Sequence, residues 1–319
     1  MNRILFAGTP DICVPLLEKL ASEFDVAGVL TNCDKPQGRS KQPVASPAKE
    51  TAVRLGIPVI QFDSLKSEAR QAVKALGADT LVTFAFGKIF GPKFLALFPN
   101  GTFNVHPSHL PCFRGPSPVQ ATILSGLKRA TISIQKIGLG MDEGDIFATT
   151  DFVLDGTETT QQLEKAISLK AADFVPGVLK KAFSGELEAK PQEGEASYCR
   201  MLDKSSALID FTRTASEVHS FIRAMYPWPK AYAILGNQIV FITGVWGGFS
   251  DVANQSPLCN VKPGTVLEMR KDRGIAIACS DKAVWVTSLQ LPGKKELDFR
   301  SFANGNSRFL SSVLNDTSV

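Results

Sequence analysis

The chain has 319 residues, of which 44% are hydrophobic, and its 35 basic and 31 acidic side chains give a net charge of +4. This apolar content excludes a mainly disordered chain, and the length is sufficient for about two domains with a core each. No apolar run approaches the ~18 residues of a membrane-spanning helix, and the first residues lack the pattern of a signal peptide. We therefore expect a cytoplasmic protein.

Six cysteines are spread along the chain without a C-x-x-C pair, and only three histidines occur. This distribution argues against a disulfide framework, a zinc site and a histidine-rich metal centre, so we expect no metal. The small excess of basic residues shows that the protein as a whole is not strongly basic. A polyanionic partner would therefore be met by local basic patches.

The first 185 residues alternate between short apolar runs and amphipathic segments. Strands are expected over residues 3–8, 25–31, 57–62, 79–86, 102–106, 130–137 and 145–154, and helices over residues 10–21 and 159–183. Near-continuous Val, Ile, Leu and Phe runs between helical patterns predict an α/β domain with a Rossmann-like, mostly parallel sheet over residues 1–185. We expect Pro176 to kink or interrupt the long helix.

The character of the sequence changes after this part. Residues 186–206 are polar, contain Gly and Pro and lack periodicity, which predicts a linker at the surface. In residues 207–319 a short helix over 215–225 precedes five short alternating strands. These strands are expected over residues 231–236, 238–245, 264–269, 274–280 and 283–291. Their regular spacing predicts a small OB-like β-barrel domain.

Asn104 and His106 are two residues apart on a predicted strand, so their side chains lie on the same face. They also lie at the carboxyl end of this strand, where open α/β sheets bind their ligands. A hydrogen-bonded core histidine beside a turn-capping asparagine would have the same sequence. The pair alone therefore leaves both interpretations open.

A glycine-rich turn over residues 137–146 supplies Asp142, Glu143 and Asp145 after another strand. An aspartate that reaches His106 would orient the imidazole and raise its pKa, as a general acid or base requires. For Glu143 a solvated acidic turn is the simpler interpretation, and a metal site at His106 lacks further ligands at the usual spacing. The chain contains neither G-x-G-x-x-G nor G-x-x-x-x-G-K-[ST], so a dinucleotide or nucleoside triphosphate is not supported.

Several separated motifs together resemble the 10-formyltetrahydrofolate-dependent formyltransferases. They are Gly8-Thr9-Pro10, Asn104-Val105-His106, Ser108-x-Leu110-Pro111-x-x-Arg114-Gly115, Pro118-x-Gln120, Met141-Asp142-x-Gly144-Asp145, Ile222-Arg223-Ala224-x-x-Pro227-Trp228-Pro229 and Leu289-x-x-x-Gly293-Lys294-Lys295. The resemblance covers nearly the whole chain, and the combined pattern is specific although each tripeptide is weak. The chain departs from the family at Pro107, His109 and Cys112, beside the catalytic strand, and at Lys88.

The resemblance implies an enzyme that transfers the formyl group of 10-formyltetrahydrofolate to a neutral amine without a metal. Asn104 and a protonated His106 would donate hydrogen bonds to the oxyanion of the tetrahedral intermediate. Asp142 would orient His106, help to keep it protonated and assist proton transfer. The folate would be held by Phe86, Gly87, Lys88, Ile89, Ser108, Leu110, Pro111 and Asp142, with main-chain groups of residues 84–90 at the pterin ring.

A Pro-, Gly- and Ser-rich segment over residues 31–50 bears on the amine acceptor, although its composition would also suit a mobile solvated loop. By resemblance it wedges into the acceptor end of initiator tRNA. Arg39 would be the leading contact, beside Lys35 and Lys41, and Lys271, Lys294 and Lys295 would contact the tRNA backbone from the second domain.

We therefore expect a monomeric enzyme that formylates the methionyl group on initiator tRNA for translation initiation. A second hypothesis is a nucleotide-sugar amine formyltransferase, which shares the same Asn–His–Asp core but needs no basic wedge. A third hypothesis is a catalytically silent RNA-binding protein. The intact set of Asn104, His106 and Asp142 argues against the third hypothesis, because a binding protein does not need a proton-transfer pair.

Overall fold

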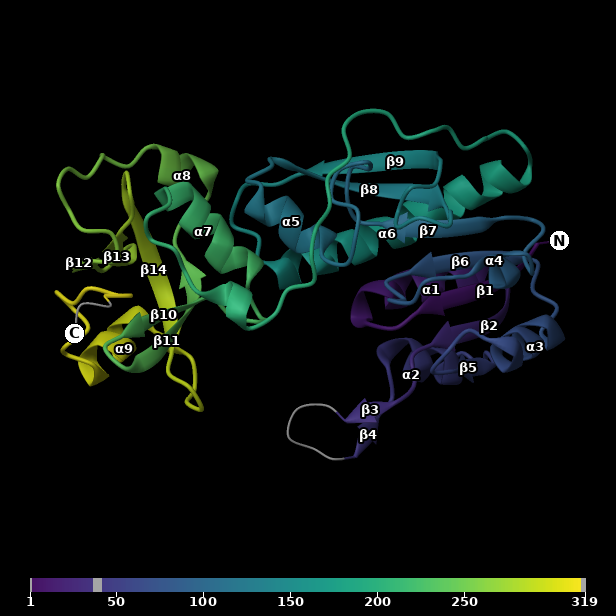
Figure 1. Ribbon diagram of the computed structural model, residues 1–319, viewed down its shortest axis with the longest axis horizontal. Helices are drawn as coiled ribbons and strands as arrows, with labels where there is room; N and C mark the ends of the chain where they lie inside the picture. Colours follow the sequence, from purple (N-terminus) through teal and green to yellow (C-terminus); the bar gives the residue numbers. More distant parts are fainter. Residues whose placement is uncertain (1, 37–41, 317–319) are drawn as a thin grey trace. The chain divides into compact units, whose positions relative to one another are not determined.

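Figure 1 shows the computed structural model, which describes residues 2–36 and 42–316 of the chain. The chain divides into two compact units. The first comprises Met1–Pro118, Thr131–Phe152 and Glu164–Cys199, and the second comprises Val119–Ala130, Val153–Leu163 and Arg200–Val319. The domain boundaries that the sequence suggests, after residues 185 and 206, stay a prediction. None of the described helices is long and apolar enough to cross a bilayer.

A seven-stranded sheet in the order β5-β2-β1-β6-β7-β8-β9 forms the centre of the first unit. Its strands are β1 (Arg3–Gly8), β2 (Asp25–Thr31), β5 (Val59–Gln61), β6 (Thr80–Phe84), β7 (Thr102–His106), β8 (Arg129–Lys136) and β9 (Ile146–Val153), and a separate hairpin pairs β3 (Lys35–Pro36) with β4 (Pro43–Val44). The first five strands of the sheet pair in parallel, whereas β8 runs antiparallel to β7. The central strands β1 and β6 are almost wholly buried, which is why each is a continuous apolar run. The predicted mostly parallel, Rossmann-like sheet is confirmed.

The long helix α6 runs without interruption through Pro176. Together with α6 (Thr160–Phe183), the helices of this part of the chain are η1 (Asp11–Cys13), α1 (Val14–Glu23), α2 (Pro47–Arg54), α3 (Ser67–Ala75), α4 (Pro92–Leu95) and α5 (Pro118–Leu124). Proline removes one intrahelical hydrogen bond. Against that loss, five residues spaced four apart bury their side chains: Leu163, Ile167, Ala171, Val175 and Leu179. The expected interruption at Pro176 is therefore wrong, because this buried stripe continues on both sides of it.

The segment after β2 is more regular than its composition suggests. Its arms form the β3–β4 hairpin, and helix α2 begins directly after Ser46. The Ser46 hydroxyl accepts a hydrogen bond from the Lys49 N–H at 3.2 Å, a standard N-terminal cap. The Lys49 ammonium also lies 2.6 Å from Asp34, so it joins α2 to the residue before β3. The irregular loop expected over residues 31–50 therefore ends at Ser46.

The second unit is built around an antiparallel sheet in the order β10-β11-β14-β13-β12, with β15 paired to β14. Its elements are η2 (Ser205–Ala207), α7 (Ala215–Ala224), β10 (Tyr232–Leu235), β11 (Gln238–Val245), α8 (Phe249–Ala253), β12 (Val266–Arg270), β13 (Gly274–Ala278), β14 (Ala283–Gln290), β15 (Leu297–Asp298) and α9 (Phe299–Gly305). Each of the five strands predicted here is present, within two residues of its expected bounds.

The last described residues close this sheet into a barrel. The N–H of Val266 in β12 donates to Ser312 O at 2.8 Å, and the N–H of Asn315 donates to Ile234 O in β10 at 2.7 Å. The Asn315 side-chain oxygen accepts from the N–H of Ile234 at 2.7 Å. The segment between these contacts thus takes the place of a strand between β12 and β10, which fits the predicted OB-like barrel.

Helix α7 carries a buried pair of basic side chains, His219 and Arg223. Arg223 donates from Nε to His219 Nδ1 at 3.2 Å and from Nη1 to the carbonyl of Glu158 at 2.8 Å. His219 Nε2 lies 3.0 Å from the carbonyl of Gly247. Burial, and then the charge of Arg223, lower the pKa of His219 to about 4. His219 is therefore neutral, with Nδ1 accepting and Nε2 donating.

This pair predicts an acid-sensitive fold. Because the pKa of His219 is about 4 in the folded chain and near 6.5 when exposed, the unfolded chain binds more protons between these values. The free energy of unfolding should therefore fall as the pH drops from 6.5 to 4, by about 3 kcal/mol from this residue. His219→Gln keeps an acceptor and a donor but cannot titrate. Denaturant unfolding at several pH values should show a shallower acid loss for this variant, and equal pH dependence would contradict the account.

Candidate active site

Polar side chains from two neighbouring strands gather at the carboxyl edge of the first unit's sheet. Asn104 and His106 lie on β7 with one residue between them, so both project from the same face. In the pairing with β8, Asn104 stands opposite Gln135 and His106 opposite Ser133. Open α/β sheets bind their ligands at this edge. The location therefore suits a substrate site.

The carboxylate of Asp142 connects these groups. Its Oδ1 accepts hydrogen bonds from Asn104 Nδ2 at 3.2 Å and from Gln135 Nε2 at 2.8 Å. Its Oδ2 accepts from the backbone N–H of Gly115 at 2.9 Å and lies 3.6 Å from His106 Nδ1. The structure thus brings Asn104, His106 and Asp142 together around one carboxylate, while their catalytic roles stay predictions.

Both ring nitrogens of His106 face acceptor oxygens. His106 is 4% exposed, and its Nε2 lies 3.0 Å from the carbonyl of Phe113 while Nδ1 faces Asp142. Phe113 and Asp142 both adopt left-handed backbone conformations, with φ of 59° and 54°. Positive φ is uncommon for residues other than glycine, although aspartate adopts it more often than phenylalanine, and such conformations are concentrated at functional sites.

The protonation state of His106 differs from the sequence-based expectation. Burial lowers the pKa of His106, and this outweighs Asp142 and the Phe113 carbonyl, which both raise it. In the free protein the imidazole is therefore neutral at neutral pH. Asp142 favours the protonated form, as expected from the sequence, but its effect on the pKa is smaller than that of burial. With Nε2–H donating to Phe113, the Nδ1 lone pair is left on the side of Asp142.

The first four residues predicted to hold folate follow β6. Phe86 is buried and stacks on Phe90 with 5.4 Å between ring centroids. The Lys88 ammonium donates to the carbonyl of Phe62 and lies 5.9 Å from the Phe86 ring. Gly87 is exposed with a φ of 78°, and Ile89 is 75% exposed. Here a ligand would meet the Ile89 side chain and main-chain atoms rather than the Phe86 ring.

The other predicted folate residues follow β7. Ser108 is buried, its hydroxyl donates to Cys112 O at 2.6 Å, and its carbonyl accepts from Ser133 Oγ at 2.7 Å. Leu110 and Pro111 are also buried and are joined by a cis peptide bond. These side chains shape the loop that carries Phe113 and Gly115. A role of this set in folate binding stays a prediction.

The residues predicted to contact tRNA are distributed over both units. Lys35 is exposed on β3, whereas Arg39 and Lys41 lie outside the described residues. Lys271 is exposed between β12 and β13, and the exposed residues Lys294 and Lys295 lie between β14 and β15. Their contact with tRNA stays a prediction.

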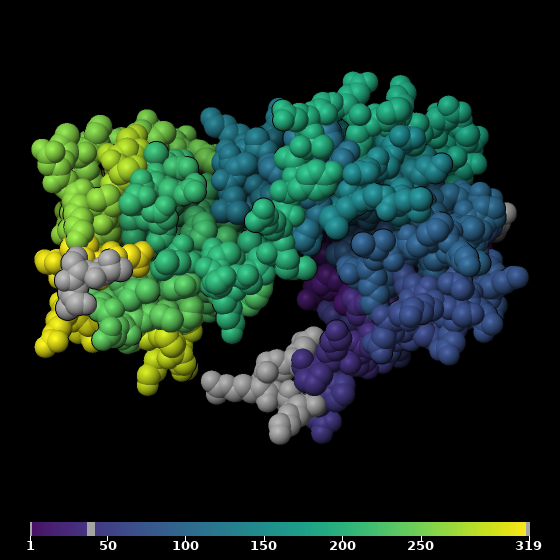
Figure 2. All heavy atoms as spheres, viewed as in Figure 1, coloured from purple at the N-terminus to yellow at the C-terminus, as the bar shows by residue number. Residues whose placement is uncertain are grey.

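Two glutamines that are absent from the predicted site contact Asp142. Gln135 is 2% exposed on β8. An amide side chain within an otherwise apolar predicted strand could have marked it as part of the site. Gln192 belongs to the predicted linker and gave no such signal. Its Nε2 donates to the carbonyls of Asp142 and Gly144, each at 2.8 Å. Figure 2 shows residues 184–199, in teal to green, at the surface of the first unit.

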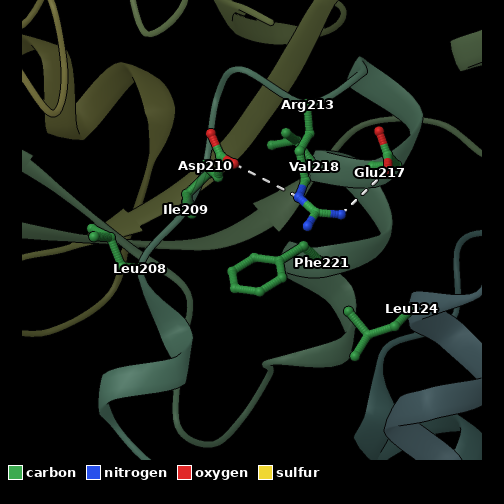
Figure 3. A pocket seen from close by; sticks show the side chains of 8 residues that line it. All are labelled: Leu124, Leu208, Ile209, Asp210, Arg213, Glu217, Val218 and Phe221. Atoms are coloured by element: carbon green, nitrogen blue, oxygen red, sulfur yellow. Dashed lines mark hydrogen bonds and ion pairs between the residues drawn. The ribbon is translucent and has the colours of Figure 1, made fainter.

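A separate pocket of about 410 Å³ lies in the second unit (Figure 3). Apolar side chains line much of it, and Arg213 stands between Asp210 and Glu217 at 3.7 Å and 3.4 Å. These charged groups are about half exposed and pair with one another. None of the residues around Asp142 lines this pocket, so it is no part of the candidate active site.

Comparison with known families gives two matches that together span most of the chain. Residues 2–179 match the family described as formyl transferase, and residues 201–307 match the formyl transferase C-terminal domain. The methionyl-tRNA formyltransferase of Treponema denticola is 38% identical over 317 residues, which cover 97% of this chain and 98% of that protein.

Solved structures show the same fold at low sequence identity. The methionyl-tRNA formyltransferase from Clostridium thermocellum is 18% identical with a TM-score of 0.55, covering 77% of this chain and 93% of its own. The sugar 3N-formyl transferase WlaRD is 19% identical with a TM-score of 0.64, covering 92% and 99%. At such identities the likeness concerns the fold alone.

The geometry predicts that Asp142 supports the protonated form of His106 electrostatically. Asp142→Asn keeps the shape but removes the charge, so the pKa of His106 should fall below its value in the unaltered protein. NMR titration can follow this, since the chain has only three histidines. Glu143→Gln, an equal charge change on the same turn, should leave the pKa of His106 in place. An unchanged pKa in Asp142→Asn would show that the carboxylate does not act on the imidazole.

Proposed function

The chain belongs to the formyl transferase family, and from this premise we propose that it transfers the formyl group of 10-formyltetrahydrofolate to the amino group of methionyl initiator tRNA, for translation initiation. The observation that carries the proposal is the 38% identity to a methionyl-tRNA formyltransferase over nearly the full length of both chains. The three groups that the chemistry needs lie within that matched length, at the carboxyl edge of the sheet.

The reaction forms a bond between the amine nitrogen and the formyl carbon and breaks the bond from that carbon to N10 of the folate. The tetrahedral intermediate carries an oxyanion, which hydrogen-bond donors stabilise. An amide carries two N–H groups, and one on Asn104 already donates to Asp142. In our proposal the second N–H of Asn104 donates to the oxyanion, and the hydrogen bond to Asp142 keeps the amide oriented for it.

His106 moves the proton in this scheme. The neutral imidazole accepts a proton at Nδ1 from the attacking amine as the new bond forms. The resulting imidazolium lies between the Asp142 carboxylate and the Phe113 carbonyl, which both favour the charged form. It then returns the proton to N10 as the folate departs. Burial makes His106 a base at neutral pH, and Asp142 stabilises the charge that follows.

The remaining assignments complete the proposal. Residues 1–185 form the catalytic domain, 186–206 a linker and 207–319 the tRNA-binding domain of a cytoplasmic monomer. The pterin ring binds at residues 84–90 and near Asp142, and exposed lysines of the second unit contact tRNA phosphates. A nucleotide-sugar amine is the alternative acceptor. It has less support, because the likeness to a sugar 3N-formyl transferase is one of fold at 19% identity.

Loss of the imidazole or of the amide donor should abolish most formyl transfer. We expect Asn104→Ala to lower kcat by roughly 10²–10³, as for other oxyanion donors, and His106→Ala to lower it at least as much. The assay is transfer of labelled formyl groups to methionyl initiator tRNA. His109→Ala, a change at an exposed histidine on the next loop, should retain activity. Near-normal turnover by His106→Ala would reject the mechanism.

The acceptor can be tested through charge. The KM for tRNA should rise steeply with salt and in Arg39→Ala, because phosphate contacts release counterions, whereas the KM for folate should change little. Initial rates over a range of potassium chloride concentrations measure both. A flat salt response, or equal activity on a nucleotide-linked amino sugar, would favour the alternative acceptor.

A further inference from the structure

Residues 190–199 pair with the loops of the candidate active site at both of their ends. Near the start, Lys190 and Ile146 exchange backbone hydrogen bonds of 2.9 Å and 2.7 Å. Near the end, Arg114 N–H donates to Ser197 O at 2.9 Å and Cys199 N–H donates to Arg114 O at 2.8 Å. The segment is therefore fixed to the β9 side and to the loop after β7, with Gln192 between the two attachments.

The side-chain amide of Gln192 is fully engaged. It donates from Nε2 to the carbonyls of Asp142 and Gly144 at 2.8 Å each. Its Oε1 accepts from Arg114, at 3.2 Å from Nε and 2.7 Å from Nη2. A primary amide offers two N–H groups and two lone pairs, so these contacts use its whole capacity. A side chain bonded in this way has one position.

The two carbonyls that Gln192 holds flank the strained part of the turn. Asp142 has a φ of 54°, and Gly144 packs so closely on the preceding strand that a Cβ there would lie 1.7 Å from Lys136 O. The left-handed conformation of Asp142 costs more than a right-handed one, although aspartate adopts it more readily than most residues with a side chain. Gln192 supplies two hydrogen bonds to the main chain of the turn in which this conformation occurs.

Through Arg114, Gln192 is also connected to the loop whose Gly115 N–H binds the Asp142 carboxylate. The guanidinium of Arg114 lies 3.5 Å from Glu143 and donates to the Tyr198 hydroxyl at 3.1 Å. The next residue, Gly115, gives its backbone N–H to Asp142 Oδ2. One amide thus joins the main chain of the turn to the loop that holds its carboxylate.

We propose that Gln192 is a positioning residue that sets the Asp142 carboxylate against His106, and that residues 190–199 belong to the active-site framework rather than to a passive linker. The expected loss of kcat rests on the proposed function, whereas the effect of Gln192 on the position of the Asp142 carboxylate does not. Without the two donors of Gln192 the turn relaxes and the carboxylate moves away from the imidazole. Misplacement of this kind lowers kcat by about 10–100-fold in sites whose supporting contacts are removed.

The test compares three variants in the full chain. Gln192→Ala removes every contact, and Gln192→Glu keeps the acceptor for Arg114 but loses both donors. Glu193→Ala changes the exposed neighbouring side chain and serves as the control. We expect kcat for formyl transfer to fall about 10–100-fold in the first two variants and to stay unchanged in the control.

A second readout is independent of activity. NMR titration of His106 should show its pKa lowered in Gln192→Ala, in the same direction as in Asp142→Asn. Gln192→Glu is compared by kcat alone, because its new carboxylate would itself raise the pKa of His106. Wild-type kcat with an unchanged His106 titration would overturn the proposal, as would full activity in Gln192→Glu, since anchoring of Arg114 alone would then suffice. If Gln192→Ala does not fold, Gln192→Met keeps the side-chain length and is tested in its place for the fall in kcat and for the lowered pKa of His106. Absence of formyl transfer in the unaltered protein would reject the proposed function, while the His106 titration would still decide the positioning role.

Discussion

The arrangement of the site depends on how one carboxylate is held. Asp142 projects from a turn in a left-handed conformation, yet its two oxygens receive hydrogen bonds from a β7 amide, a β8 amide and the backbone of the loop after β7. Because these donors come from separate stretches of chain, the carboxylate fixes the relative positions of the groups around His106. Burial alone favours the neutral imidazole of His106, whereas the fixed negative charge of Asp142 stabilises the protonated form.

The framework around this carboxylate also explains the strained residues. Phe113 and Asp142, the two residues whose oxygens face the ring nitrogens of His106, are both held at positive φ. Such conformations require support from neighbouring chain, and the segment from Lys190 to Cys199 provides it by pairing with Ile146 and Arg114. The residues that face His106 are therefore held in place by ordinary backbone hydrogen bonds from a segment further along the chain.

Much of this was accessible from sequence, for physical reasons. Buried parallel strands must be apolar along their length, so the sheet and the position of Asn104 and His106 at its edge could be predicted. The antiparallel direction of β8 has no such signature. The continuity of α6 through Pro176 depends on tertiary packing, and Gln192 is a polar residue in a polar segment whose partner lies 50 positions away. The sign of the His106 pKa shift likewise depends on a burial that no local pattern reveals.

We expect His106 and Asp142 to act as one unit, and a double-substitution cycle on formyl transfer tests this most directly. Rates of label transfer to methionyl initiator tRNA would be compared for the unaltered protein, His106→Ala, Asp142→Asn and the double variant. Groups that act as a unit are strongly non-additive, so the second substitution should cost little beyond the first. Losses that multiply in the double variant would mean that the two side chains act independently and would contradict this account.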